Sequence, residues 1–149
     1  MNIGRTEQTR SLFEDEYQMY QLHAVAGRDD LKARASTAVF ADIAFGHHSW
    51  YDGSGGYPEG YVRLASPYRQ MTDVAAMVSC LLEYDPGDPA AAIRGVIARE
   101  GRQLSPMVTA CLNDEAVAAQ VAALLADDGR AYYQSIYQEL IAGKGGAND

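Results

Sequence analysis

The sequence predicts one all-α domain, a bundle of short helices that does not form a coiled coil. The 149 residues fall within the usual size of a single domain, and 48% of them are hydrophobic, which is enough for a buried core. Apolar residues recur at helical intervals along most of the chain, whereas no window shows the sustained alternation of a strand. No repeat of fixed period is visible, which argues against a solenoid. We therefore expect residues 1–149 to form a single helical domain.

The first two predicted helices end at glycines. The first covers 5–26, and Gly27 is its expected stop. The second follows two aspartates, which suit a helix start, and covers 31–45 up to Gly46. It leads directly into a pair of histidines.

The segment 47–67 is predicted to be an irregular loop. It contains four glycines, two prolines and three tyrosines, with neither helical nor strand periodicity. A loop of this length without its own secondary structure is uncommon in a compact domain and is more often functional than not.

Further helices are expected after the loop. Asp88 before Pro89 and Ser105 before Pro106 repeat one start signal, a capping residue followed by proline at the first helical position. The predicted ranges are 68–82, 89–100, 106–112, 113–126 and 130–142. The tail 143–149 is expected to be disordered.

Charge and hydropathy limit the classes of partner. A net charge of -8 repels a phosphate backbone, so we expect no nucleic-acid polymer as partner. The longest uncharged apolar stretches, such as 117–126, are far shorter than the ~20 residues of a membrane span, and no signal peptide follows Met1. The sequence therefore predicts a cytoplasmic protein without a membrane partner.

The most informative stretch runs from His47 to Gly60 and reads HHSWYDGSGGYPEG. It resembles the HD-GYP family, whose pattern HHxxxDGxGYP it matches with one additional glycine. His23 lies 24 positions before the histidine pair, where the family places another metal-binding histidine, and Asp73 lies where the family carries a metal-binding aspartate. The resemblance covers about residues 20–112 and implies the C-terminal half of a helical HD-GYP domain.

Members of this family hold two or three divalent metals, usually iron or manganese, and hydrolyse cyclic di-GMP. Imidazole and carboxylate suit such ions, and zinc is a further candidate. The metal ligands implied by the resemblance are His23, His47, His48 and Asp73. The residues implied to contact a cyclic dinucleotide or another nucleotide are Asp52, Gly53, Tyr57, Pro58 and Arg63.

The chain also departs from the family pattern. The His-Asp doublet that names the family is absent, and Ser49 replaces the glutamate that usually follows the histidine pair. We therefore expect a degenerate HD-GYP-like protein that does not catalyse by itself and binds a metal ion, a nucleotide or a partner protein in a regulatory role. One alternative is a metal-dependent phosphodiesterase whose missing ligands come from another segment or chain. A second is a structural interaction module in which the motif is a relic.

Plainer interpretations stay open for each feature. The histidines could be inherited residues satisfied by hydrogen bonds without a metal, and the Asp-Gly and Tyr-Pro pairs could serve only as turns. The stripe of 132–141 is expected to be core, with an interface as the alternative; its residues are Tyr132, Tyr133, Ile136, Tyr137, Leu140 and Ile141. Because a half-domain leaves faces uncovered, a homodimer is also predicted.

Overall fold

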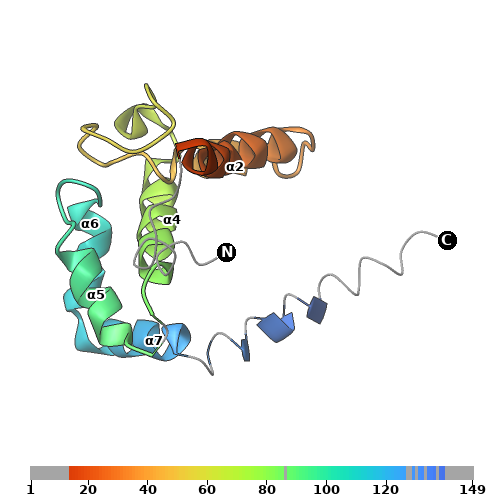
Figure 1. Cartoon of the computed structure of the whole chain (residues 1–149). Coiled ribbons are helices and arrows are strands. Elements are labelled where there is room, and N and C mark those ends of the chain that lie inside the picture. Colours follow the sequence, from red (N-terminus) through yellow and green to blue (C-terminus); the bar gives the residue numbers. More distant parts are fainter. Residues whose placement is uncertain are drawn as a thin grey trace.

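The computed structural model describes residues 14–85 and 87–126, together with positions 129, 131, 132, 134–136, 138 and 139. The predicted all-α class is confirmed: this part of the chain is helical and contains isolated β-bridges but no strand. The elements are α2 (Glu14–Lys32), η1 (Ala38–Phe40), α3 (Ala41–Gly46), η2 (Arg63–Ala65), α4 (Arg69–Leu82), α5 (Pro89–Ile97), α6 (Pro106–Thr109), η3 (Ala110–Asn113) and α7 (Glu115–Leu125). Figure 1 shows their arrangement.

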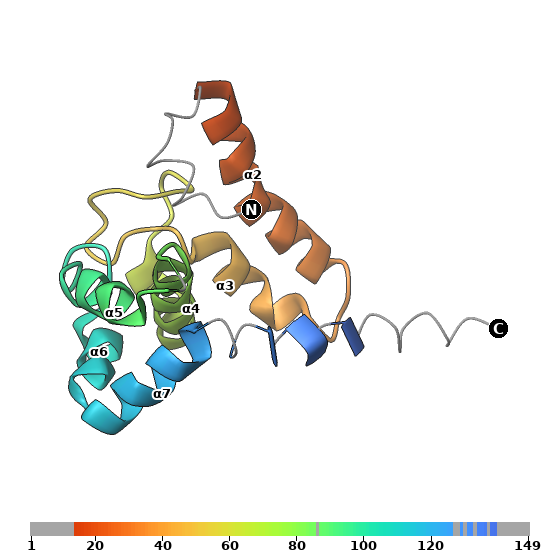
Figure 2. The same cartoon turned by 60° about the horizontal axis from the view of Figure 1, so that its bottom comes forward.

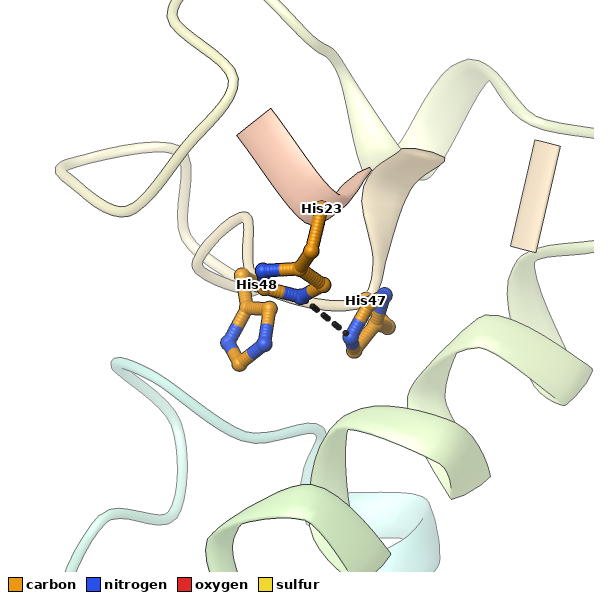
Figure 3. Close-up of side chains that lie close together, drawn as sticks. All are labelled: His23, His47 and His48. Carbon is orange, nitrogen blue, oxygen red and sulfur yellow. Dashed lines mark hydrogen bonds between the residues drawn. The ribbon is translucent and has the colours of Figure 1, made fainter. Parts of the chain in front are cut away.

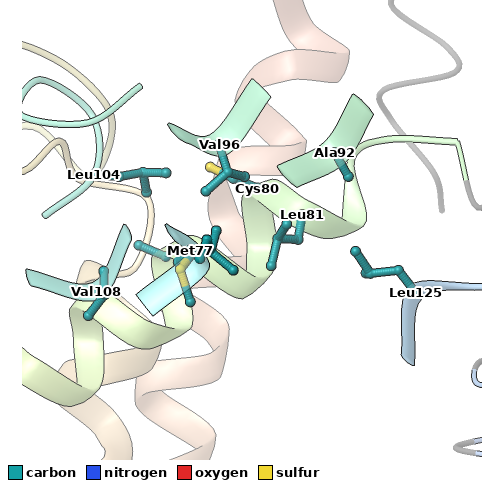
Figure 4. Close-up of a cluster of buried hydrophobic side chains, with 10 residues drawn as sticks. Met77, Cys80, Leu81, Ala92, Val96, Leu104, Val108 and Leu125 are labelled. Carbon is teal, nitrogen blue, oxygen red and sulfur yellow. The ribbon is translucent and has the colours of Figure 1, made fainter. Parts of the chain in front are cut away.

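The hydrophobic core lies between α4 and the helices that follow it. α5 returns alongside α4 after a short connection, and α6, η3 and α7 close the group (Figure 1). The buried cluster comprises Ala76, Met77, Cys80, Leu81, Ala92, Val96, Leu104, Val108, Leu112 and Leu125 (Figure 4). The cluster residues on α4 are Ala76, Met77, Cys80 and Leu81, which lie on one face of the helix.

The helices α2 and α3 form a separate layer that shares no residue with this core cluster. Figure 2 shows α2 lying along α3, away from α7. Their contact is built from small residues, since Ala24 and Ala41 are each 1% exposed. Gly27 belongs to the same contact, because a Cβ at this position would lie 3.5 Å from the Cβ of Ala44.

Two helix boundaries predicted at the N-terminal side are wrong. Gly27 does not end the first helix, which continues to Lys32 and packs on α3, since a single glycine costs a helix only about 1 kcal/mol. The predicted second helix, 31–45, begins only with η1 and α3, after a turn at residues 33–37. Positions 5–13 of the first predicted helix lie outside the described residues.

The remaining boundaries agree more closely with the sequence. The segment 47–67 is irregular apart from η2, and α4, α5 and α7 start within two residues of their predicted positions. The described positions of 130–142 are helical, but Tyr132 is 64% exposed and is not a core residue as expected. The predicted disordered tail, 143–149, lies outside the described residues.

One face of α4 is apolar and exposed. With Ile43 of α3 it lines a groove of about 630 Å³ through Met71, Val74, Ala75, Val78 and Leu82. The homodimer predicted from the sequence stays a prediction.

Over the described residues, no single helix has the length and apolar content to cross a membrane, although 106–113 and 115–125, bent by 95°, meet that test as a pair.

Candidate metal centre

Three histidines converge where α2 meets the end of α3. His23 comes from the middle of α2, His47 is the C-cap residue of α3, and His48 begins the loop. One ring nitrogen of each residue lies within 4.8 Å of the other two (Figure 3). The structure thus brings together all the histidines of the chain, although 24 positions separate His23 from the pair.

Backbone carbonyls fix the tautomers of two of these rings. Nδ1 of His23 donates to the carbonyl oxygen of Tyr20 at 2.6 Å, and Nδ1 of His47 donates to that of Ala44 at 2.8 Å. A carbonyl oxygen can only accept, so Nδ1 must carry the hydrogen in both rings. In the neutral imidazoles, both Nε2 atoms therefore present lone pairs, and they face each other at 3.5 Å.

The environment keeps the histidine pair neutral. Burial lowers the pKa of His48 to about 3, with further lowering by the neighbouring His47, His23 and Arg63. Burial also lowers the pKa of His47, although its hydrogen bond to Ala44 opposes the shift. At neutral pH these imidazoles are uncharged, which is the form that binds a metal ion.

Aromatic rings enclose the histidines. The ring of Tyr57 stacks on His48 with centroids 4.6 Å apart and an interplanar angle of 20°. The ring of Tyr20 lies 4.8 Å from that of His23 and 6.5 Å from that of Tyr57. Both tyrosines therefore form part of the wall around the histidine cluster.

The geometry of the three histidines fits one transition-metal ion. Zinc–nitrogen bonds of 2.0–2.1 Å at tetrahedral angles place two ligand nitrogens about 3.3 Å apart. The Nε2 atoms of His23 and His47 are separated by 3.5 Å, close to that value. The wider spacing to His48 can close by rotation of χ2, which is a soft torsion for histidine. Three protein ligands leave the fourth position of a tetrahedral ion open.

Asp73 does not join the histidines. Its carboxylate is 1% exposed and forms an ion pair with Arg63, whose Nη1 lies 3.3 Å from Oδ1. Burial raises the pKa of this carboxyl, and Arg63 and Ser105 oppose the shift. Among the described residues, the group with converging ligand atoms consists of the histidines alone. A role of Asp73 as a metal ligand thus stays a prediction, and it would require the ion pair to break.

The loop after the histidines is a closed, tight structure. Tyr57 N donates to the His48 carbonyl at 3.2 Å, and Trp50 N donates to that of Gly55 at 3.0 Å. The motif has two consecutive glycines, Gly55 and Gly56, and the structure explains why each position requires a glycine. At Gly55 a Cβ would strike the Trp50 ring, and Gly56 has a φ of +82° and lies against the His48 carbonyl.

The loop is also hydrogen-bonded to the turn that follows α5. Tyr51 N and Asp52 N donate to the carbonyls of Gln103 and Arg102, each at 3.1 Å. The guanidinium of Arg102 lies 4.9 Å from the centroid of a Trp50 ring, over its face. The loop is therefore a bridge between the histidines and the turn that follows α5.

A cavity of about 450 Å³ lies inside this loop. Of the residues predicted to contact a nucleotide, it is lined by Asp52, Gly53, Pro58 and Arg63, whereas Tyr57 faces His48 instead. Asp52 accepts a hydrogen bond from Ser54 N at 2.8 Å, which lowers the pKa of its carboxyl. Because the lining also includes Glu59 and the charge of Arg63 is neutralised by Asp73, the cavity favours a neutral or cationic ligand over a phosphate.

Sequence reasoning missed the groups that orient the histidines. The carbonyls of Tyr20 and Ala44 each lie three residues before the histidine they hold, but a backbone carbonyl has no sequence signature. It also missed the ion pair of Arg63 with Asp73, since neither helical nor strand spacing links these positions.

Comparison with known proteins adds no relative. No family model, no characterised protein and no solved structure matches the chain. The HD-GYP resemblance accordingly rests on the residues of the motif alone.

Proposed function

We propose that this chain is a degenerate HD-GYP-like protein whose three histidines bind one divalent metal ion, and that it has a regulatory rather than a catalytic role. The observation that carries the proposal is the 3.5 Å approach of the Nε2 atoms of His23 and His47, two rings whose Nδ1 atoms both donate to backbone carbonyls. His48 supplies the third imidazole. Iron, manganese and zinc are the candidate ions, and all of them accept imidazole ligands.

A cation explains this arrangement better than a relic does. Two lone pairs that face each other repel, and either a shared proton or a metal ion must relieve the repulsion. On the His47 ring a proton is disfavoured at neutral pH, because burial lowers the pKa of this imidazole. A metal ion bound to both Nε2 atoms would satisfy them and also connect α2 to the loop.

Two observations favour binding over hydrolysis of a phosphodiester. Asp73, the carboxylate that the resemblance assigns to metal binding, is engaged by Arg63. The adjacent cavity carries Asp52 and Glu59, which repel a phosphate. We expect the metal-loaded chain to leave cyclic di-GMP intact, and release of the linear dinucleotide, abolished by His48→Gln, would contradict this.

The decisive experiment is metal analysis by mass spectrometry on protein purified without a histidine tag. We expect about one equivalent of a transition metal in the native chain, retained in Cys111→Ser and lost in His47→Gln/His48→Gln. Cys111 is the matched control because its thiol is exposed and could bind metal by itself. If the native chain, incubated with iron, manganese or zinc, retains no metal after desalting, the proposal is wrong.

A further inference from the structure

Arg63 is a buried cation at the edge of the histidine centre. Its side chain is 1% exposed, as is that of Asp73, with which it forms the ion pair. Nη2 donates to the carbonyl oxygens of Ser49 and of His47, the latter at 3.4 Å. The guanidinium thus contacts the backbone on both sides of His48.

This position decides which ligands a metal ion can use. A buried carboxylate needs a cation beside it, and Arg63 already supplies that cation to Asp73. The converging ligands that remain are three neutral imidazoles. An ion bound there gains no charge neutralisation from the described ligands, and it lies near the positive charge of Arg63.

We propose that Arg63 takes the place of a metal cation beside Asp73, so that the centre holds a single ion and selects one of the zinc class. Neutral nitrogen ligands bind zinc, nickel, cobalt and copper strongly through their donor character. Manganese, magnesium and calcium depend on carboxylate oxygen ligands, which Arg63 withholds. This inference rests on the proposed function, since it specifies the metal of the same site.

The charge balance of Arg63 and Asp73 provides the test. Arg63→Gln removes the cation and leaves the Asp73 carboxylate available as an anionic ligand. Arg63→Gln/Asp73→Asn removes both charges, keeps a hydrogen-bonding side chain at each position, and is the matched control. If the single variant folds poorly, the double variant still tests the inference, because it leaves no unpaired buried charge.

The affinities of zinc and manganese should be measured for each chain by competition with a chromophoric chelator. We expect one zinc per native chain, bound roughly tenfold or more tighter than manganese. Arg63→Gln should gain manganese affinity by about tenfold or more, and the double variant should lose that gain while it keeps its zinc.

Two results would overturn the inference and leave the proposed function intact. The first is a native chain that binds manganese as tightly as zinc. The second is a double variant that loses zinc, which would make Asp73 a ligand in the native protein. Failure of the proposed function looks different: neither ion would bind, or binding would survive His48→Gln.

Discussion

His48 and His47 couple the stability of the metal-free chain to pH. Burial lowers the pKa of His47, and that of His48 falls to about 3, against about 6.5 in an unfolded chain. Between these values the unfolded chain binds more protons than the folded one, so acid favours unfolding. The contribution is complete above about pH 6.5 and is lost as the pH falls.

We therefore expect the free energy of unfolding in urea to decrease from pH 7.5 to pH 5, a window above most carboxyl titrations. His48→Gln should show a shallower decrease, because glutamine has no proton to gain. If the free energy of unfolding falls equally with pH in the native chain and in this variant, His48 is not the source of the pH dependence.

The glycines of the loop differ in what a side chain would meet. Gly56 has a φ of +82° and lies against the His48 carbonyl, whereas Gly53 has a φ of +77° and a Cβ added there would meet nothing within 4 Å. Gly53→Ala should cost about 1 kcal/mol for the left-handed backbone alone. Gly56→Ala should cost about 2–4 kcal/mol, because strain and overpacking add.

Denaturant unfolding of both glycine variants measures this difference, and zinc affinity provides a second readout. Gly56 lies in the turn that holds the His48 carbonyl, so Gly56→Ala should weaken zinc binding and Gly53→Ala should not. Equal losses of stability in the two variants would mean that the close approach to His48 has no energetic weight.

At the scale of helices, two aspartates start α5 and α7. Asp88 accepts a hydrogen bond from Ala91 N at 2.9 Å, and Asp114 accepts from Ala116 N and Val117 N. Substitution of either by alanine should lower the free energy of unfolding by about 1 kcal/mol, with the larger loss at Asp114 because it has two donors. Asp30→Ala, at an exposed position within α2, is the control and should change stability by less than about 0.5 kcal/mol. Thermal unfolding by circular dichroism compares the three variants, and equal midpoints would contradict a stabilising role of the two capping aspartates.

These helices also show which features local sequence can predict. The start of α5 depends on Asp88 and Pro89, which are neighbours, and it was predicted correctly. Ser105 does occupy the N-cap position of α6, but its side chain makes no capping hydrogen bond and is buried instead. Gly27 has the sequence signature of a helix end, yet it lies inside α2, where this helix packs on α3. Local signals therefore predict the bounds of an element correctly unless tertiary packing overrides them.

The same distinction between local sequence signals and tertiary contacts applies to the candidate site. The motif predicted that His47 and His48 act together, since they are adjacent, and the family spacing added His23. The direction in which these rings point depends on the carbonyls of Tyr20 and Ala44, and the pairing of Arg63 with Asp73 depends on the fold of the loop. Neither is encoded by a residue type at a fixed spacing, so the ligand set could be predicted only in part.

At the scale of the whole molecule, the histidines join two layers of unequal burial. The core cluster extends from α4 to α7 and includes large residues such as Leu104, which is fully buried. The contact of α2 with α3 buries mainly alanines, and Met19 and Leu22 of α2 remain 71% and 58% exposed. Because alanine buries little apolar area, we expect α2 to open locally at a lower free energy than α5 or α7.

A metal ion bound by His23, His47 and His48 would cross-link the weaker layer to the loop. Saturating zinc should therefore slow amide hydrogen exchange in α2 and in residues 47–57, while exchange in α5 stays nearly unchanged. His23→Gln is the sharpest control, because it removes the imidazole that α2 contributes and leaves the histidine pair in place. In that variant, zinc should no longer protect α2. Equal protection of α2 and α5 by zinc would point to global stabilisation and would contradict a cross-link between the layers, as would protection of α2 that persists without the His23 imidazole.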